Sequence, residues 1–248
     1  MTIALDEQIK LLAKQLKIPT FANYQHALNH AEPGNTFGEI LLALMRTEYD
    51  QRQENNNRRR LKQASFPFTK TIDELDLTRY DGQISELFVN ELASCRFIDE
   101  KKNLVLIGNP GRGKTHMAIG IGLKACANGK SVLFKNAASL STELSEAKDN
   151  YALGKLEKKI QNVDLLIIDE MGYVSFDRFQ SELLFKVIAD RSERGSTIVT
   201  TNLAFSDWTD LFENPAMVAA LVDRLTFRSY ILDMNGDSYR LDYSKNCV

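Results

Sequence analysis

Residues 108–115 read Gly-Asn-Pro-Gly-Arg-Gly-Lys-Thr, which matches the pattern G-x-x-x-x-G-K-[ST] of a phosphate-binding loop. The apolar run Leu-Val-Leu-Ile at residues 104–107 precedes the loop, and a helical pattern at residues 114–127 follows it. When strand, loop and helix follow in this order, backbone N–H groups and the positive end of the helix point at the same place. The stretch therefore predicts a site for a nucleoside triphosphate.

Two side chains of the loop have distinct expected roles. Lys114 is expected against the outer phosphates, and the hydroxyl of Thr115 is expected to hold Mg²⁺. ATP and Mg²⁺ are therefore the predicted cofactors. The predicted nucleotide-binding residues are Gly108, Asn109, Pro110, Gly111, Arg112, Gly113, Lys114, Thr115 and His116.

From the loop onward, strand and helix patterns alternate. Strands are predicted at residues 104–108, 131–135, 164–169 and 196–201, and helices at 84–95, 114–127, 139–148, 152–161, 178–192 and 215–224. The turn pair Asn235-Gly236, flanked by residues 230–234 and 238–243, predicts a hairpin. Strands that alternate with helices at this spacing favour a mostly parallel sheet covered on both faces.

The N-terminal part of the chain has a different sequence pattern, with apolar residues at helix spacing, and is predicted to be wholly helical. A long helix is expected to begin at Thr36, with Glu39 completing a capping box. Phe-Pro-Phe at residues 66–68 indicates an extended linker, because the residue before a proline avoids the helical region. We therefore expect a small helical domain at residues 1–65 and an ATPase domain at 66–248.

Composition narrows the class of protein. The net charge of −2 gives no global attraction to nucleic acid or membrane, so a DNA-binding surface has to be a local patch. The three cysteines, Cys95, Cys126 and Cys247, lack the spacing of a zinc site and indicate a reducing compartment. No signal peptide and no stretch of ~20 apolar residues is present, so we expect a cytoplasmic protein without a membrane partner.

A second motif, Leu-Leu-Ile-Ile-Asp-Glu at residues 165–170, places two acids at the end of a strand buried on both faces. In α/β sheets ligands bind at the carboxyl ends of the strands, so the acidic pair is expected beside the phosphate loop. Asp169 is expected to hold Mg²⁺ through water. Glu170 is expected to orient and deprotonate an attacking water.

Two further polar residues are candidates for catalysis. Asn202 follows the next predicted strand and could bond the attacking water or a phosphate oxygen, although Thr-Thr-Asn after a strand is also typical of a turn. Arg224 could reach the γ-phosphate bound by a neighbouring subunit. By residue type alone, an ordinary helix arginine paired with a surface carboxylate is the more typical interpretation. Arg191, Arg194 and Arg228 compete for the same role.

The order of these motifs resembles an AAA+ ATPase. More closely, four stretches are similar to the IstB-like ATP-binding proteins: residues 113–120 (Gly-Lys-Thr-His-Met-Ala-Ile-Gly), 165–173, 193–208 and 219–225. The segment 235–240 and the N-terminal Phe-Gly-Glu at residues 37–39 are also similar. The resemblance covers nearly the whole chain.

The resemblance implies a helper ATPase for transposition. Such proteins bind DNA with ATP, assemble into oligomers, and assist a transposase encoded by the same insertion sequence in choosing its target. A helicase loader of the DnaC type is the alternative, and a nucleotide-gated DNA-binding scaffold with little turnover is a third. Carried over residue by residue, the resemblance assigns Lys114, Glu170, Asn202 and Arg224 to catalysis, and Thr115 and Asp169 to the metal.

This chain departs from the family pattern at two loop positions. Asn109 stands where Pro or Ala is usual, and Arg112 replaces a small residue before the second loop glycine. An arginine at the loop tip could pair with a phosphate or obstruct it. The chain also ends soon after the predicted hairpin, so no C-terminal helical lid is expected.

Two basic segments are candidates for contact with DNA phosphates. The first spans residues 46–62 and the second residues 135–159, and neither carries a base-reading motif, so weak preference for sequence on duplex DNA is expected. A solvated helix end with i,i+4 pairs, such as Glu48 with Arg52, is the alternative for the first. The candidate side chains are Arg46, Arg52, Arg58, Arg59, Arg60, Lys62, Lys148, Lys155, Lys158 and Lys159.

Overall fold

The computed structural model describes residues 2–30, 32, 34–80, 84–173, 175–212 and 214–236. Contacts between residues divide the chain into two units, Met1–Arg59 and Arg60–Val248. We call them the N-terminal unit and the phosphate-loop unit. The division falls inside one long helix, α3 (Phe37–Ala64), which contributes residues to both units.

The N-terminal unit contains α1 (Thr2–Gln15), η1 (Pro19–Asn23), α2 (Tyr24–Asn29) and the first part of α3. The predicted capping box begins α3: Thr36 N donates to Glu39 Oε2 at 2.6 Å, and Glu39 N donates to Thr36 Oγ1 at 3.3 Å. Both of these predictions, the helical character and the cap, are confirmed. Whether residues 1–65 act as a domain with its own partner stays a prediction.

The N-terminal unit buries few apolar side chains. Among its described residues, only Ala13 and Leu44 are buried hydrophobic side chains. Its exposed large apolar side chains are Leu5, Leu11, Leu12, Leu16, Leu28, Phe37, Leu42, Met45 and Tyr49. The unit therefore has only a thin core of its own.

The phosphate-loop unit is built on a parallel sheet of five strands, in the order β2-β3-β4-β1-β5. Its strands are β1 (Asn103–Ile107), β2 (Val132–Asn136), β3 (Leu165–Asp169), β4 (Ser196–Thr201) and β5 (Ser229–Asp233). Every residue of β3 and β4 is buried, which explains their nearly continuous runs of apolar and β-branched residues. The predicted parallel sheet is confirmed.

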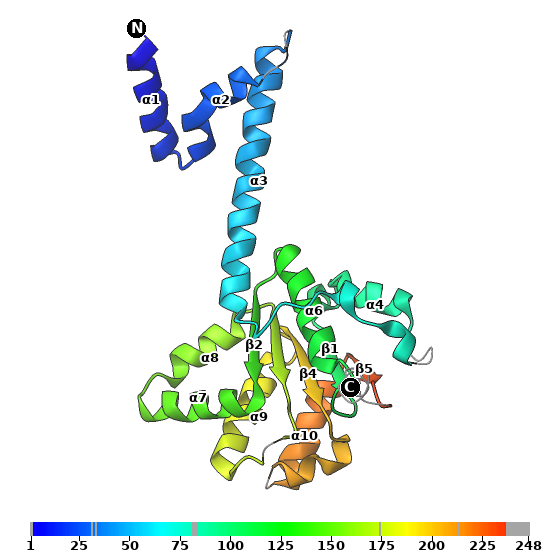
Figure 1. Cartoon of the computed structure of the whole chain (residues 1–248). Helices are drawn as coiled ribbons and strands as arrows, with labels where there is room; N and C mark the ends of the chain where they lie inside the picture. The colour runs from blue at the N-terminus through cyan, green and yellow to red at the C-terminus, as the bar shows by residue number, and fades with distance from the viewer. Residues whose placement is uncertain are drawn as a thin grey trace, which may run out of the picture. The chain divides into compact units, whose positions relative to one another are not determined.

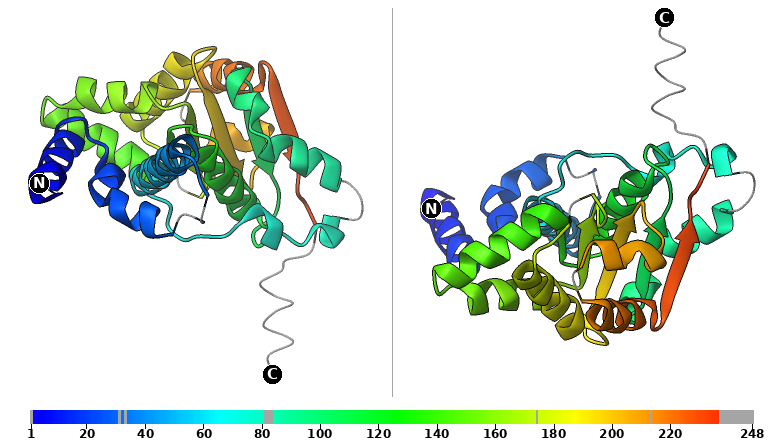
Figure 2. Two further views of the ribbon diagram at one scale, coloured as in Figure 1. Left: turned by 90° about the horizontal axis from the view of Figure 1, so that it is seen from above. Right: turned by 90° about the horizontal axis from the view of Figure 1, so that it is seen from below.

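Helices cover both faces of this sheet (Figures 1 and 2). One face packs against α4 (Glu86–Ala93), α5 (Arg96–Asp99) and α6 (Lys114–Ala127). The other packs against α7 (Ala137–Asp149), α8 (Leu153–Gln161), α9 (Arg178–Arg191) and α10 (Pro215–Thr226). This three-layer arrangement brings the carboxyl ends of β1, β3 and β4 to the same edge.

The structure differs from the sequence-based expectations in two places. β5 lies parallel to β1, with Leu104 opposite Tyr230, a pairing that the sequence patterns did not predict. The hairpin stays a prediction, because its second arm, residues 238–243, lies outside the described residues. Three short helical turns, η2 (Ile72–Glu74), η3 (Leu77–Tyr80) and η4 (Phe205–Asp210), were not expected, because runs this short carry no periodic pattern. No helix follows α10 within residues 227–236, and no helix in the described part of the chain could cross a bilayer.

Candidate nucleotide-binding site

The phosphate loop connects β1 to α6, and two of its glycines are required by shape. Gly113 caps α6 in the left-handed region, at φ +82°, and a Cβ there would lie 3.0 Å from the Tyr80 hydroxyl. A Cβ on Gly108 would lie 2.6 Å from the backbone carbonyl of Met234. A side chain at either position would push the loop away from η3 or from the end of β5.

The predicted phosphate ligand, Lys114, lies folded against the loop. Its ammonium group donates to the carbonyl oxygens of Gly108 at 2.6 Å and Asn109 at 2.9 Å, and the residue is 8% exposed. The charge is thus held inside the curve of the loop.

A hydroxyl and a carboxylate meet where a metal was predicted. Thr115 Oγ1 donates to Asp169 Oδ1 at 2.9 Å, and Thr200 Oγ1 donates to the same oxygen at 2.6 Å. Burial raises the pKa of Asp169, and the bonds from Thr200 and Thr115 offset only part of that rise. Oxygen ligands from a hydroxyl and a carboxylate suit Mg²⁺, so the residues present fit this ion.

Glu170 sits at a bend in the chain and is fixed by two neighbours. It adopts φ 60°, which is uncommon for a residue with a side chain and recurs at functional sites. Its backbone N–H donates to Thr200 Oγ1 at 2.9 Å, and its Oε2 accepts from Asn136 Nδ2 at 2.7 Å. The carboxylate itself is exposed at the edge of the sheet.

Sequence reasoning missed Asn136. It ends β2 directly opposite Asp169 in the β2–β3 register, and its side-chain oxygen also accepts from Ala138 N at 3.0 Å, which caps α7. The available signal was a polar residue after an apolar strand, as for Asn202. Only the strand order shows that Asn136 reaches Glu170.

A cleft of about 430 Å³ lies over the loop. The predicted residues that it brings together are Pro110, Gly111, Arg112, Gly113, Lys114, Thr115, His116, Glu170 and Asn202. Residues before β1 complete its wall, and sequence reasoning missed them: Phe68, Lys70, Glu74, Leu75, Asp76, Arg79 and Tyr80. One predicted residue, His116, is bonded through Nε2 to the carbonyl of Thr71 at 2.7 Å.

Asn202 follows β4 and also lines this cleft. Its side-chain oxygen Oδ1 is buried and has no hydrogen-bond partner among the residues described. Buried polar atoms are normally satisfied, so an oxygen without a partner marks Asn202 as a candidate functional residue in the lining of the cleft. A Cβ on the neighbouring Gly172 would lie 2.6 Å from it, which keeps that position small.

Two of the arginine candidates for catalysis, Arg191 and Arg224, differ in burial and in hydrogen bonding. Arg191 is 1% exposed, and its guanidinium donates to the carbonyls of Ile160 at 2.6 Å and Ser196 at 2.7 Å, among others, so it is a structural residue. Arg224 is partly exposed on α10, donates to Ala220 O at 2.9 Å, and lies 5.2 Å from the ring centre of Phe185. Arg224 is not among the residues lining the cleft of its own chain.

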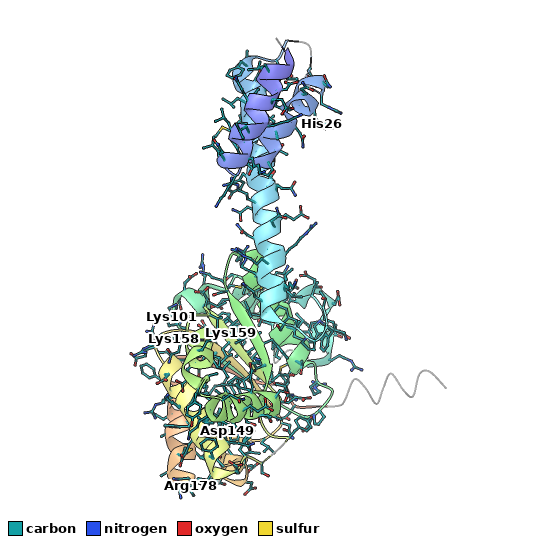
Figure 3. All side chains as sticks on the ribbon, turned by 90° about the vertical axis from the view of Figure 1, so that its left-hand side faces the viewer. His26, Lys101, Asp149, Lys158, Lys159 and Arg178 are labelled. Atoms are coloured by element: carbon teal, nitrogen blue, oxygen red, sulfur yellow. The ribbon has the colours of Figure 1, made fainter. Side chains whose placement is uncertain are left out.

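The basic residues predicted to contact DNA fall into two groups. Several are engaged within the protein: Arg52 with Glu48, Arg58 with Glu54, Arg60 with the carbonyl of Cys126, and Lys148 over the ring of Phe179. The others are exposed and have no recorded partner in the described part of the chain: Arg46, Arg59, Lys62, Lys155, Lys158 and Lys159. Figure 3 shows Lys158 and Lys159 on the outer surface of the phosphate-loop unit.

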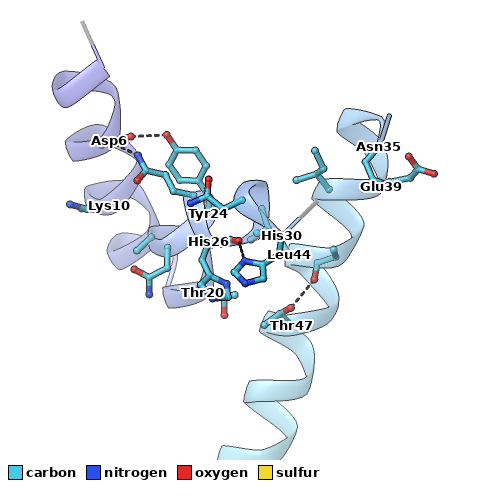
Figure 4. Close-up of a pocket in the computed structure, with 17 residues that line it drawn as sticks. Asp6, Lys10, Thr20, Tyr24, His26, His30, Asn35, Glu39, Leu44 and Thr47 are labelled. Atoms are coloured by element: carbon cyan, nitrogen blue, oxygen red, sulfur yellow. Dashed lines mark hydrogen bonds between the residues drawn. The ribbon is translucent and has the colours of Figure 1, made fainter. Parts of the chain in front are cut away.

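A second hollow, of about 1000 Å³, lies wholly within the N-terminal unit (Figure 4). Asp6 accepts bonds from the Tyr24 hydroxyl at 2.6 Å and from Gln25 Nε2 at 2.8 Å at its rim. The stacked rings of His26 and His30 also line it. The described residues contain no group of three side chains suited to a metal ion, and this hollow shows no catalytic arrangement.

Comparison with known proteins agrees with this geometry. The family model described as IstB-like ATP binding protein matches residues 11–247. The ATP-binding protein of insertion sequence IS5376 from Geobacillus stearothermophilus is 36% identical over 240 residues, covering 95% of this chain and 94% of the relative. That of insertion sequence IS21 from Pseudomonas aeruginosa is 34% identical over 236 residues, covering 94% and 89%.

Solved structures with the same fold are more distant. The DnaC helicase loader is 20% identical with a TM-score of 0.54, over 71% of this chain and 98% of that one. AMPPCP-bound DnaA from Aquifex aeolicus is 16% identical with a TM-score of 0.57, over 72% and 54%. At these identities the likeness shows the fold alone, and it confirms the predicted α/β fold with a parallel sheet between helices.

Proposed function

Because the chain belongs to the family of IstB-like ATP-binding proteins, we propose that it hydrolyses ATP and assembles on DNA as a helper of insertion-sequence transposition. The observation that carries this proposal is the bond of 2.9 Å between Thr115 and Asp169. It joins the phosphate loop to the acidic strand end, beside an exposed Glu170 and within reach of a cleft.

In this proposal the loop binds the phosphates and the two oxygen ligands hold the metal. Lys114 leaves the carbonyls of Gly108 and Asn109 to pair with the outer phosphates. Thr115 and Asp169 would hold Mg²⁺, which would supply positive charge for the phosphates. The buried carboxylate of Asp169 would then have a compensating charge beside it.

Hydrolysis then depends on groups at the strand ends. Glu170 accepts the proton of the attacking water, and Asn136 keeps its carboxylate in place through the bond of 2.7 Å. The unpartnered oxygen of Asn202 orients the water or a protonated group beside it. Arg224 does not line the cleft of its own chain, and we assign it to the γ-phosphate site of a neighbouring copy.

Assembly on DNA completes the proposal. The exposed lysines of α8 and the unpaired basic residues of α3 contact phosphates without reading bases, and copies of the chain associate through nucleotide. A transposase encoded by the same element is the expected partner, and the cytoplasm is the expected site of action. The family membership and the names of the relatives support this role.

The alternatives rest on narrower support. A helicase loader has the fold in its favour, since the chain covers 98% of the DnaC loader structure. A scaffold with little turnover was suggested by Arg112, because an arginine at the tip of the loop could obstruct a phosphate. The guanidinium of Arg112 donates to the carbonyls of Met234 and Arg79, which weakens that argument.

Co-sedimentation of the full chain with two unrelated duplexes, in ATP, in ADP and without nucleotide, tests the proposal. We expect large complexes on both duplexes with ATP only, together with phosphate release stimulated by DNA. Replacing Lys155, Lys158 and Lys159 by Ala should reduce the salt dependence of binding, whereas Lys10→Ala, in an exposed pair with Glu7, should not. Binding that ignores nucleotide, or a stable complex with a replicative helicase, would contradict the transposition role.

A further inference from the structure

The two loop residues that depart from the family pattern contact the same short segment. The backbone N–H of Asn109 donates to the side-chain oxygen of Asn235 at 3.0 Å, and its side-chain Nδ2 donates to the carbonyl oxygen of Gly236 at 3.5 Å. Arg112 Nε donates to the carbonyl oxygen of Met234 at 3.1 Å. All three acceptors belong to residues 234–236, which leave the edge strand β5. We call residues 234–236 the exit segment.

Arg112 is also tied to the opposite side of the loop. Its Nη2 donates to the carbonyl of Arg79 at 2.8 Å, and its guanidinium lies 4.9 Å from the ring centre of Tyr80. The Tyr80 hydroxyl donates to the backbone carbonyl of Arg112 itself. Arg112 is only 7% exposed, so its side chain is wedged between η3 and the exit segment.

Two further contacts hold the exit segment against the loop. Met234 N donates to the carbonyl of Ile107 at 2.6 Å, which extends the β1–β5 pairing up to the first loop glycine. A Cβ on Gly236 would lie 2.9 Å from Cζ of Arg112, so the guanidinium packs directly on that backbone. The loop, η3 and β5 therefore meet at one side chain.

We propose that Arg112 and Asn109 are positioning residues that fasten the phosphate loop to the exit segment and hold it in the shape that receives phosphate. Arg112 acts on the nucleotide through the loop backbone, and its charge does not pair with a phosphate. The inference rests on the proposed nucleotide site, because it assigns the loop shape to the binding of ATP.

Replacing Arg112 tests whether shape or charge matters. Arg112→Lys keeps the charge but loses the planar guanidinium that serves two carbonyls and stacks on Tyr80. We expect Arg112→Lys and Arg112→Thr to weaken binding of fluorescent ATP and ADP alike, by about tenfold each. Arg178→Lys, at an exposed arginine on α9, is the matched control and should leave both affinities unchanged. Wild-type affinity in Arg112→Lys combined with a loss in Arg112→Thr would overturn the proposal.

A double-mutant cycle of Asn235→Ala and Arg112→Thr tests whether the contacts of Asn109 and Arg112 both act through the exit segment. This exposed residue can be changed without leaving a buried charge, so the variant should fold. If Asn235→Ala weakens binding by about tenfold on its own, the double variant with Arg112→Thr should fall well short of the roughly hundredfold loss that independent effects give. A full hundredfold loss would contradict a shared route.

Hydrogen exchange without nucleotide separates failure of this inference from failure of the proposed function. In Arg112→Lys and Asn235→Ala we expect amides of residues 229–236 to exchange several-fold faster, with residues 153–161 of α8 unchanged. Unchanged exchange at 229–236 would overturn the fastening. Faster exchange in a protein whose wild type binds no ATP would leave the fastening intact and refute the nucleotide site.

Discussion

Among the described residues, each unit of the molecule buries one carboxylate, and the pKa values of these two carboxylates are shifted in opposite directions. Glu48 in the N-terminal unit is 6% exposed and Asp169 in the phosphate-loop unit is 5% exposed. Burial alone would raise the pKa of Glu48, but hydrogen bonds from Arg52 and Thr20 lower it below the usual range. For Asp169, burial prevails over the bonds from Thr200 and Thr115, and its pKa is raised.

The difference lies in what each carboxylate contacts. Arg52 neutralises Glu48 through a bond of 2.7 Å, and Thr20 N donates to its other oxygen at 3.0 Å, so the group fastens η1 to α3. Asp169 receives its hydrogen bonds from two hydroxyls, which solvate its charge without cancelling it. A buried carboxylate whose charge is not neutralised, at the carboxyl edge of a parallel sheet, is suited to bind a cation.

The largest effect is expected at a third acid, Glu170, which is exposed and held by an amide. Glu170→Gln keeps the size of the side chain but removes the group that accepts a proton, so phosphate release should fall about 10²–10⁴-fold. ATP affinity should stay within a few fold of the wild type. Steady-state phosphate release and equilibrium binding measure the two effects, and Glu7→Gln at an exposed acid of α1 is the control. Unaltered turnover in Glu170→Gln would remove Glu170 from catalysis.

Asp169→Asn tests whether the buried carboxylate of Asp169 serves a metal ion or, like Glu48, stabilises the fold. The amide oxygen can still accept from Thr115 and Thr200, but the charge for the metal is gone, so hydrolysis should fall about 10²-fold or more. Because burial raises the pKa of Asp169, its charged form is disfavoured in the folded state, and the variant without Mg²⁺ should unfold at a temperature no lower than the wild type. Calorimetry measures this, and a large drop would show that Asp169 is a structural group like Glu48.

Matched leucines distinguish the cores of the two units. Leu166 in β3 is 0% exposed and Leu12 in α1 is 54% exposed. Leu166→Ala should lower the free energy of unfolding by about 3–5 kcal/mol, and Leu12→Ala by less than about 1 kcal/mol. The single tryptophan, Trp208, is fully buried in the phosphate-loop unit, so its fluorescence in urea measures the effect of Leu166→Ala. Far-ultraviolet circular dichroism, which also detects α1, measures the effect of Leu12→Ala. Equal effects of the two substitutions would show that α1 packs into a core.

Glu48→Gln is expected to lower the free energy of unfolding by about 1–2 kcal/mol, less than Leu166→Ala, with the effect confined to the N-terminal unit. Since the folded pKa of Glu48 is lowered, its stabilising contribution is present above the ordinary value of 4.5 and is lost as the pH falls below it. Far-ultraviolet circular dichroism, which sees all helices, should therefore show an earlier transition than Trp208 fluorescence in acid. If both probes change together in the wild type and the variant, the two units unfold as one.

Much of the phosphate-loop unit could be predicted from local patterns. The helix predicted at residues 114–127 matches α6 residue for residue, because a glycine cap and apolar spacing fix both of its ends. The buried runs of β1, β3 and β4 were equally clear. The parallel placement of β5 was not, since the turn pair Asn235-Gly236 is typical of a hairpin and only the sheet order shows that β5 pairs with β1.

Contacts between distant segments escaped prediction for the same reason. Asn136 reaches Glu170 because β2 lies beside β3, a fact of strand order. Arg191 was a candidate for catalysis by residue type, and no local pattern reveals that five oxygen atoms surround its guanidinium. The direction of Arg112, into the protein, likewise depends on η3 and the exit segment.

The most direct test of the central claim is titration of the full chain with ATP and Mg²⁺, in the wild type, Lys114→Ala and Asp169→Asn. The account predicts that the wild type binds ATP and releases phosphate, that Lys114→Ala loses binding by about a hundredfold or more, and that Asp169→Asn loses the dependence on Mg²⁺. Equal ATP binding by all three proteins, or no phosphate release from the wild type with DNA present, would contradict it.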